Sequence, residues 1–470
     1  MGPVEIEIMP VSETRVALSA QFASEATALR KRWFADREVL DSICRGLSEV
    51  IEDSGALPAS EDAAGELREE TTRRLKDLGL ALFQELLKQE GDRISEMSGE
   101  GKHTRYIIFK IDRSLAYLPV EMMFDGTEFL SRRMAMGRVI YAENTPGRPA
   151  RDRTPPYRVF VAGDPSDDPA IRPDVESEID QLRRIFTRSA GFALRIQRGP
   201  EVTRQSILTH LPGTTVFHFT GHGVARAGDA ATGIKLGADK VLGGEALSGL
   251  QDPPGLAFLN MCTPVPWLAW KGALGLVETL LARGTRACVA SLWDVRSAAA
   301  TRLASCFYER LFEGETFGHA LRMARTDLAE AFGPDAATWA AYTLYGDPRL
   351  SLEDLDAAPA GRGGKLHTLT VLASVLVLLA ALLFPVATVK ENLGTPPEIP
   401  VGYLVVESIP ADAAILIDGQ ARGMTPSTVE VAAGNHRIIL QKQGYRRWEA
   451  WIEVKESAKT VLEPNLVRIQ

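Results

Sequence analysis

An uninterrupted apolar segment divides the chain into two unequal parts. Residues 369–389 read LTVLASVLVLLAALLFPVATV, without one charged residue. At 1.5 Å per residue, a helix over this segment would span about 31 Å, close to the hydrocarbon core of a bilayer. The alternative is a buried core helix, but such helices seldom run so far without a polar face. The sequence therefore predicts a single transmembrane helix over residues 366–389.

The residues flanking this segment predict its orientation. Arg362 and Lys365 precede it, whereas Lys390 and Glu391 follow it, and the cytoplasmic side of a membrane helix usually carries the excess of positive charge. The first twenty residues have no continuous apolar core and do not resemble a signal peptide. We expect a single-pass protein of the cell membrane, with a cytoplasmic N-terminal part and an extracytoplasmic C-terminal part.

Composition excludes several classes of protein. The chain is 45% hydrophobic and 24% charged, with a net charge of -8 and no long run of Lys or Arg, so we expect folded domains and no nucleic-acid partner. None of the four cysteines forms a CxxC pair or stands at zinc-ligand spacing from a histidine. We therefore expect no metal and no cofactor, and the cysteines, all before the apolar segment, agree with a reducing compartment.

The N-terminal part shows two kinds of periodicity. Residues 20–55 and 62–96 have apolar residues at helical spacing and predict helices. From residue 104 onward, apolar strands alternate with amphipathic helices, which favours an α/β domain with a mainly parallel sheet flanked by helices. The predicted strands are 104–112, 137–143, 157–165, 192–198 and 214–221, and the predicted helices between them are 175–186 and 203–211.

Three apolar strands end at residues that can carry chemistry. VFHFT precedes GHG with His222, GLAFLN precedes MCTP with Cys262, and ACVASLW ends at Trp293 before DVRS. Ligands of a parallel sheet gather outside the carboxyl ends of its strands. If these three strands are parallel neighbours, the imidazole, the thiol and the loop after Trp293 share one rim.

A histidine and a cysteine at such a rim can form a nucleophilic pair. The imidazole lowers the pKa of the thiol and later protonates the leaving amine. Gly221 and Gly223 would allow a sharp turn after the strand, and the backbone N–H groups of Gly223 and Cys262 are candidates for an oxyanion hole. The alternative is that His222 and Cys262 are structural. We expect this for His218, which alternates with phenylalanines in a strand, and for Cys288 and Cys306.

An ordered series of motifs resembles the CHAT domains, caspase-like proteins related to separases and other clan CD cysteine peptidases. The resemblance covers about residues 65–353 and runs through SLAYLPVEMMFDGTEFLSRR, VFVAGDP, FHFTGHG, FLNMCTP, SLWDVRS, FYERL and YGDPRL in that order. It implies a caspase-like fold. By this likeness His222 matches the general base of the family and Cys262 matches its nucleophile.

The loop after SLW departs from the pattern of many relatives, which carry acidic residues a few positions on. Here Trp293, Asp294 and Arg296 are the candidate residues of a specificity pocket. A desolvated arginine could pair with an acidic substrate residue, whereas an aspartate would favour a basic one. The simpler alternative, that Arg296 is a solvated residue at a helix start, stays open.

Beyond the apolar segment, residues 402–468 resemble a PEGA domain, a small β module. The strands ILID, HRIIL and EAWIEV alternate in polarity, and DG and GN are typical of hairpin turns between them. The chain is thus expected to consist of six segments: an N-terminal strand and helical region at 1–64, the CHAT domain at 65–353, linkers at 354–365 and 390–401, the membrane helix at 366–389 and the β domain at 402–468.

The sequence as a whole predicts a membrane-anchored, caspase-like cysteine endopeptidase of bacterial type. Its expected partners are a protein substrate on the cytoplasmic side, membrane lipid, and a cell-envelope ligand for the β domain. The alternative is a catalytically silent scaffold or sensor of the envelope, in which the CHAT fold and the PEGA-like domain serve for binding alone.

Overall fold

A computed structural model describes most of the chain. The described residues are 3–22, 32–55, 61–88, 90–97, 105–141, 155–164, 168–188, 191–224, 233–236, 240–262, 275–333, 337–355, 401–417, 420–445, 447–455 and 457–468. They form two compact units, Met1–Gly364 and Lys365–Gln470, which are treated separately below.

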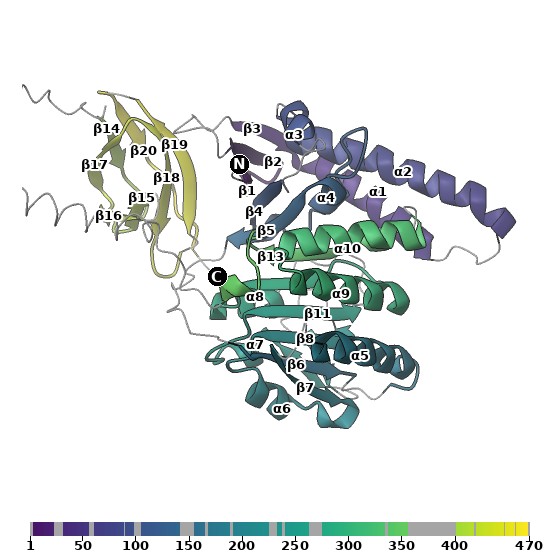
Figure 1. Cartoon of the computed structure of the whole chain (residues 1–470). Helices are drawn as coiled ribbons and strands as arrows, with labels where there is room; N and C mark the ends of the chain where they lie inside the picture. Colours follow the sequence, from purple (N-terminus) through teal and green to yellow (C-terminus); the bar gives the residue numbers. More distant parts are fainter. Residues whose placement is uncertain are drawn as a thin grey trace, which may run out of the picture. The chain divides into compact units, whose positions relative to one another are not determined.

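One large sheet organises the first unit (Figure 1). Within the described residues it has thirteen strands, in the order β10-β9-β8-β11-β12-β13-β5-β4-β1-β2-β3, with β6 and β7 added beside β8. The strands are β1 Val4–Pro10, β2 Arg15–Phe22, β3 Arg32–Asp36, β4 Tyr106–Asp112, β5 Ala135–Tyr141, β6 Tyr157–Gly163, β7 Phe192–Arg198, β8 Val216–Val224, β9 Gly233–Leu236, β10 Lys240–Gly243, β11 Leu256–Cys262, β12 Ala287–Ser291 and β13 Tyr342–Gly346.

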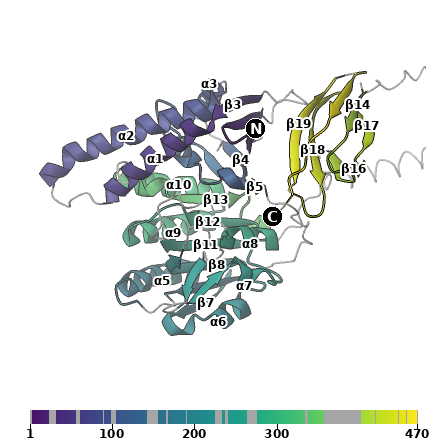
Figure 2. The same ribbon diagram turned by 180° about the vertical axis from the view of Figure 1, so that it is seen from behind.

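Helices cover both faces of this sheet, as Figures 1 and 2 show from opposite sides. Apolar residues of α5, α9 and α10 pack on one face with those of α1 and α2, and residues of α6, α7 and α8 pack on the other. The helices are α1 Arg37–Gly55, α2 Glu61–Leu87, α3 Gly91–Met97, α4 Leu130–Arg133, α5 Arg172–Thr187, α6 Arg204–His210, α7 Gly244–Leu247, α8 Gly275–Arg283, α9 Ser297–Phe312 and α10 Phe317–Phe332.

The α/β class is confirmed. The sheet is mixed, however, and the predicted parallel arrangement describes only some of its strands. Strands β7, β6, β8, β11 and β12 are parallel to one another, whereas β13 is antiparallel to β12. A single crossover helix returns the chain to the start of the next parallel strand. Here two successive helices, α9 and α10, separate β12 from β13. The chain therefore re-enters the sheet at the end where it left.

The N-terminal region differs from the helical prediction for residues 20–55. Arg15–Phe22 and Arg32–Asp36 are strands β2 and β3, and the helix α1 begins only at Arg37. The short segment of β3 has the period of a strand, since Trp33 and Ala35 are buried whereas Phe34 is exposed. These strands extend the sheet beyond β4, through the parallel pairing of β1 with β4.

The second unit is a small β domain, as the sequence predicts. Two sheets, β17-β14-β20 and β16-β15-β18-β19, enclose a core that includes Leu404, Ile415 and Ile438. The predicted GN hairpin is wrong, because β17 and β18 lie in different sheets; the DG turn lies outside the described residues. The strands are β14 Val401–Val406, β15 Ala414–Ile417, β16 Gln420–Met424, β17 Ser427–Ala432, β18 Gly434–Gln441, β19 Trp448–Val454 and β20 Lys459–Leu462.

The predicted membrane helix at 366–389 lies outside the described residues. Among the helices that the structure describes, none combines the length and the apolar character needed to cross a bilayer.

Candidate active site

The strand ends predicted to carry chemistry lie at one edge of the sheet. Strand β11 is parallel to β8 on one side and to β12 on the other. The register of β8 and β11 places Cys262 directly opposite His222. Neighbouring strands are about 4.8 Å apart, so the backbones at these two positions are adjacent although 40 residues separate them in the sequence.

The imidazole of His222 has a carboxylate partner that the sequence analysis missed. Its Nε2 lies 3.1 Å from Oδ2 of Asp168, and both side chains are about one-third exposed. The backbone N–H of Ala170 donates to Asp168. That hydrogen bond, together with the one to His222, holds the pKa of the Asp168 carboxyl below its ordinary value. The cluster of aspartates in GDPSDDP, after a strand end, was the signal available in the sequence.

Gly221, between Thr220 and His222 in β8, has an unusual backbone conformation. Its φ is +148°, a backbone conformation that favours glycine. A Cβ at this position would lie 3.2 Å from the backbone nitrogen of Asp164, at the end of β6. The sharp turn predicted after the strand is absent, since β8 continues to Val224. The glycine thus allows a positive φ within a strand that continues beyond it.

We expect Gly221→Ala to lower the free energy of unfolding by about 1–3 kcal/mol, because alanine is strained at this φ and its Cβ crowds Asp164. Urea unfolding of both proteins measures the difference. Gly249→Ala is the matched control, since a Cβ there has no atom within 4 Å. Equal stability of the two variants would contradict the strain attributed to Gly221.

The other residues predicted for the site lie in different environments. Gly223 pairs with Ile234 of the antiparallel strand β9. Trp293 is only 6% exposed and belongs to the main hydrophobic core. Asp294 and Arg296 are exposed, and Arg296 is the N-cap residue of α9. The structure therefore places the three candidate pocket residues just after β12, two of them at the surface.

The remaining cysteines are unsuited to nucleophilic chemistry. Cys44 and Cys288 are buried and Cys306 is partly buried, all three as free thiols. Burial raises the pKa of Cys288, and burial followed by the charge of Asp327 raises that of Cys306. Both thiols are thus less ionised at neutral pH than an ordinary cysteine.

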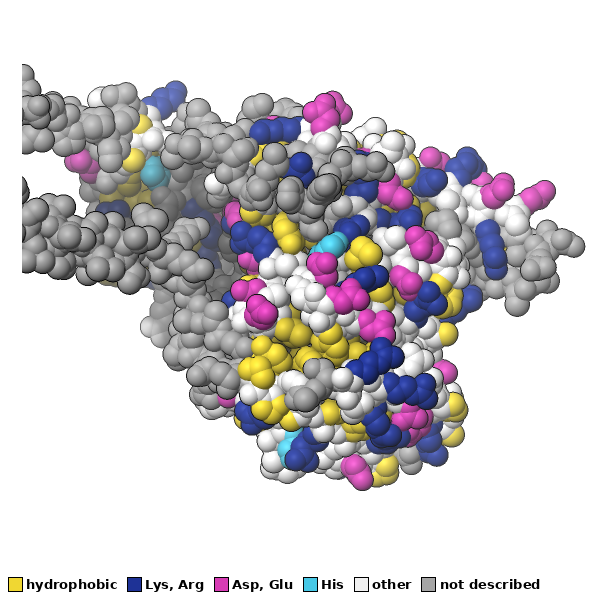
Figure 3. Space-filling view, in the orientation of Figure 1, with side chains coloured by type: hydrophobic (Ala, Val, Ile, Leu, Met, Phe, Trp, Pro, Cys, Tyr) yellow, Lys and Arg dark blue, Asp and Glu magenta, His cyan; other side chains and the backbone are white. Residues whose placement is uncertain are grey.

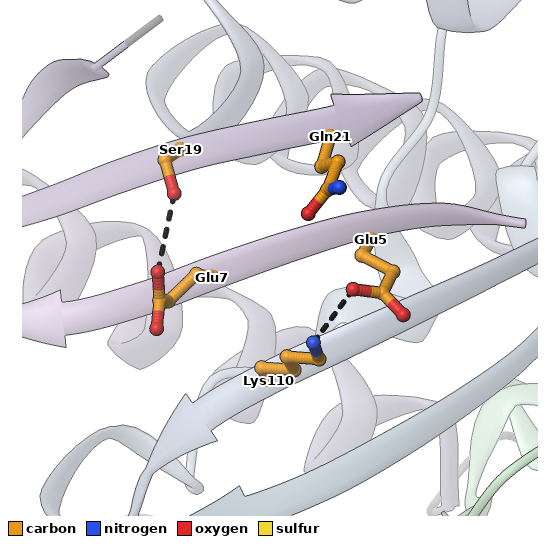
Figure 4. A pocket seen from close by; sticks show the side chains of 5 residues that line it. All are labelled: Glu5, Glu7, Ser19, Gln21 and Lys110. Carbon is orange, nitrogen blue, oxygen red and sulfur yellow. Dashed lines mark hydrogen bonds and ion pairs between the residues drawn. The ribbon is translucent and has the colours of Figure 1, made fainter. Parts of the chain in front are cut away.

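A second polar cluster lies far from the rim, on β1, β2 and β4 (Figure 4). Lys110 Nζ lies 2.6 Å from Glu5, and Ser19 Oγ donates to Glu7 at 3.3 Å, with Gln21 alongside. The Lys110 ammonium is thus neutralised by Glu5, and we assign no catalytic role to this cluster.

Charged side chains of both signs are interspersed on the face shown in Figure 3. Basic residues around α5 are partly paired: Arg183 with Asp180, and Arg188 with Glu309. Among the described residues, no group of three or more His, Cys, Asp or Glu side chains could hold a metal ion.

Comparison with known proteins assigns the family. Residues 71–347, more than half of the chain, match the CHAT domain, and residues 401–470 match the PEGA domain. The chain belongs to the CHAT domain family. None of the curated proteins matches it.

Similar solved structures include the Saccharomyces cerevisiae separase–securin complex in two crystal structures, with TM-scores of 0.48 and 0.49, 11% identity and coverage of 74% and 73% of this chain. The chain spans 30% of the length of the chain that it matches in that complex. The Arg-specific cysteine proteinase gingipain R is also similar, with a TM-score of 0.41, 14% identity and coverage of 80% of this chain and 88% of the other.

Proposed function

We propose that this protein is a cysteine endopeptidase with His222 as general base and Cys262 as nucleophile. The observation that carries the proposal is the register of two adjacent parallel strands, which sets these two positions opposite each other at the carboxyl edge of the sheet. Membership of the CHAT family adds to it, because FHFTGHG and FLNMCTP, which contain these two residues, resemble motifs of that family.

The proposed reaction proceeds by acyl transfer. The imidazole takes the proton of the Cys262 thiol, and the thiolate attacks the carbonyl carbon of the substrate. Backbone N–H groups of Gly223 and Cys262 would stabilise the resulting oxyanion. The imidazolium of His222 protonates the leaving amine as the C–N bond breaks and a thioester forms. Water, deprotonated by the same imidazole, then hydrolyses the thioester and regenerates the thiol.

In the proposed mechanism, Asp168 orients the imidazole of His222. Because Nε2 of His222 is bonded to Asp168, Nδ1 is the ring nitrogen available to the thiol. A carboxylate on the opposite nitrogen orients the ring and stabilises the imidazolium that forms during the reaction. Asp168 is partly exposed, so solvent weakens this effect.

We expect Asp168→Asn to lower the rate of peptide cleavage by about 10-fold, less than the 10²–10⁴-fold that general acid–base catalysis contributes in full. Since the pKa of Asp168 is below its ordinary value, the carboxylate is charged throughout the neutral range, and the slower cleavage by Asp168→Asn should be present throughout that range. A pH–rate profile of both proteins measures it. A ratio near one would remove Asp168 from the mechanism.

The decisive test of the proposed activity compares cellular protein N-termini between wild type and Cys262→Ala. New N-termini that depend on Cys262 would establish the peptidase and reveal its substrates together. Identical sets of N-termini, with the protein expressed in both strains, would argue against a peptidase and favour a binding function for the CHAT fold.

We further propose that residues 366–389 anchor the protein in a membrane, with the CHAT domain in the cytoplasm and the β domain in contact with envelope material outside. The support is the uncharged apolar sequence and the excess of basic residues before it. The chain should resist extraction by alkaline carbonate, and external protease should remove the β domain alone. Release into the carbonate supernatant would overturn the anchor.

A further inference from the structure

A buried carboxylate joins the two strands that carry His222 and Cys262. Glu178, on α5, accepts hydrogen bonds from Asn260 Nδ2 at 2.7 and 2.9 Å, from Thr220 Oγ1 at 2.6 Å and from His218 Nε2 at 3.1 Å. His218 and Thr220 belong to β8 and Asn260 belongs to β11. One side chain from a helix thus holds both strands.

The position of this contact along the strands is specific. Thr220 and Asn260 are paired in register, and His222 and Cys262 form the pair two residues further on. Glu178 therefore ties β8 to β11 immediately before the proposed catalytic pair.

A second layer of hydrogen bonds holds the partners of Glu178. Tyr342 Oη donates to Asn260 Oδ1 at 2.5 Å, and His218 Nδ1 lies 3.1 Å from Tyr308 Oη. Burial, and then the charge of Glu178, raises the pKa of Tyr308, so its phenol stays protonated. All of these side chains are buried, and the network leaves them a single arrangement.

Burying a carboxylate costs more free energy than burying apolar side chains, which could fill a purely structural role. The Asn260 amide and the Thr220 hydroxyl both donate to Glu178, and a carboxylate, which only accepts, suits such partners. Apolar side chains could fill the same space without the cost of removing a carboxylate from water. A directional network of this kind is justified where a nearby site needs precise geometry.

The same helix also sets the position of Asp168. The backbone N–H of Arg172, the first residue of α5, donates to the carbonyl of Asp168 at 3.1 Å. Glu178 lies further along this helix. Anchoring α5 to the strands therefore also fixes Asp168 relative to His222.

We propose that Glu178 is a positioning residue for the His222–Cys262 pair, which it aligns through Thr220 and Asn260. The inference rests on the proposed peptidase function. Glu178 acts through other side chains and does not take part in the reaction itself.

Two substitutions of Glu178 and its partner test this role. Glu178→Gln keeps the shape but introduces an N–H₂ donor among donors. The double variant Glu178→Gln/Asn260→Asp exchanges amide and carboxylate, so that a donor again faces an acceptor. A rescue of this kind separates hydrogen-bond complementarity from side-chain size.

A matched pair of threonine substitutions supplies the control for stability. Thr220→Val removes one donor from Glu178, and Thr343→Val removes one donor from the equally buried carboxylate of Glu121, which lies outside the proposed site. Both replacements preserve side-chain shape and delete one buried hydrogen bond.

The main measurement is the rate of alkylation of Cys262 by iodoacetamide in the full chain, followed by peptide mass spectrometry from pH 5 to 9.5, with the Tm of each variant. We expect Glu178→Gln to slow the reaction near neutral pH by about 10²-fold and to move its pH midpoint towards about 8.5, the value of an ordinary thiol. Thr220→Val should move the pH midpoint of alkylation in the same direction. The double variant should regain the rate and the midpoint of the wild type. Thr343→Val should lower the Tm and leave the midpoint unchanged.

A lowered Tm with an unchanged midpoint in Glu178→Gln would make this residue merely structural and overturn the inference. If Cys262 of the wild type itself reacts as an ordinary thiol, the proposed peptidase fails instead. The alignment is then measured by oxidative crosslinking of Cys262 to a His222→Cys variant, since paired positions of neighbouring strands lie within disulfide range. Equal crosslinking with and without Glu178→Gln would overturn the inference in that case.

Discussion

Replacing His222 by alanine should abolish the special reactivity of Cys262. Without the imidazole, the thiol loses both the group that accepts its proton and the positive charge that stabilises its thiolate. Its apparent pKa should rise to that of an ordinary thiol, and peptide hydrolysis should fall by about 10²–10⁴-fold. The measurements are the pH dependence of alkylation at Cys262 and the rate of cleavage of a peptide substrate.

The structure offers one control for the histidine and one for the cysteine in this experiment. His210→Ala removes another partly exposed histidine of the same unit, on α6, and should change neither quantity. Cys306, partly buried and with a raised pKa, gives the reactivity of a background thiol in the same sample. Equal labelling of Cys262 in the wild type and in His222→Ala would refute the dyad.

The largest loss of stability is expected for Glu121→Gln. The Glu121 carboxylate pairs with the Arg138 guanidinium, whose Nε lies 3.0 Å from Oε1, and Arg325 Nη2 approaches to 4.0 Å. The three side chains are at most 2% exposed. The substitution leaves two buried arginines without their anion, a defect that costs about 3–5 kcal/mol.

Urea unfolding measures this loss, with Glu128→Gln as control. Glu128 pairs with Arg132 on a more exposed surface, 3.1 Å apart, and such pairs contribute at most about 1 kcal/mol. Comparable losses in the two variants would show that the buried cluster contributes no more than a surface ion pair.

The same cluster makes stability depend on pH. Burial alone would raise the pKa of Glu121, but Arg138, with Arg325 and Thr343, holds it below its ordinary value. A depressed carboxyl pKa stabilises the fold above the pKa of the unfolded chain, and this contribution is lost as the pH falls through the folded value. Glu121→Gln should lack this part of the acid-side decrease.

Local patterns predicted much of the structure. The alternation of strands and helices from residue 104 gave the α/β class, and the polarity of the last seventy residues gave the β domain. Patterns of this kind depend on neighbouring residues, since burial on one face imposes a period of two or 3.6. The same patterns mark His222 and Cys262, because each follows an apolar strand.

Some features depended on which elements pair. The segments 15–22 and 32–36 are too short for a local pattern to distinguish a strand from a helix. Their strand structure depends on pairing, of β2 with β1 and of β3 with β2. The antiparallel direction of β13 likewise follows from the packing of α9 against α10.

The sequence by itself determined the alternation of strands and helices from residue 104 onward, the β domain and the two residues proposed for catalysis. Only the tertiary structure decided the register that opposes His222 to Cys262, the approach of Asp168 to the imidazole and the hydrogen bonds of Glu178 to both β8 and β11. Each of these contacts joins residues separated by 40 to 82 positions. Register and hydrogen bonding over such separations are set by the packing of whole elements, which no local periodicity encodes.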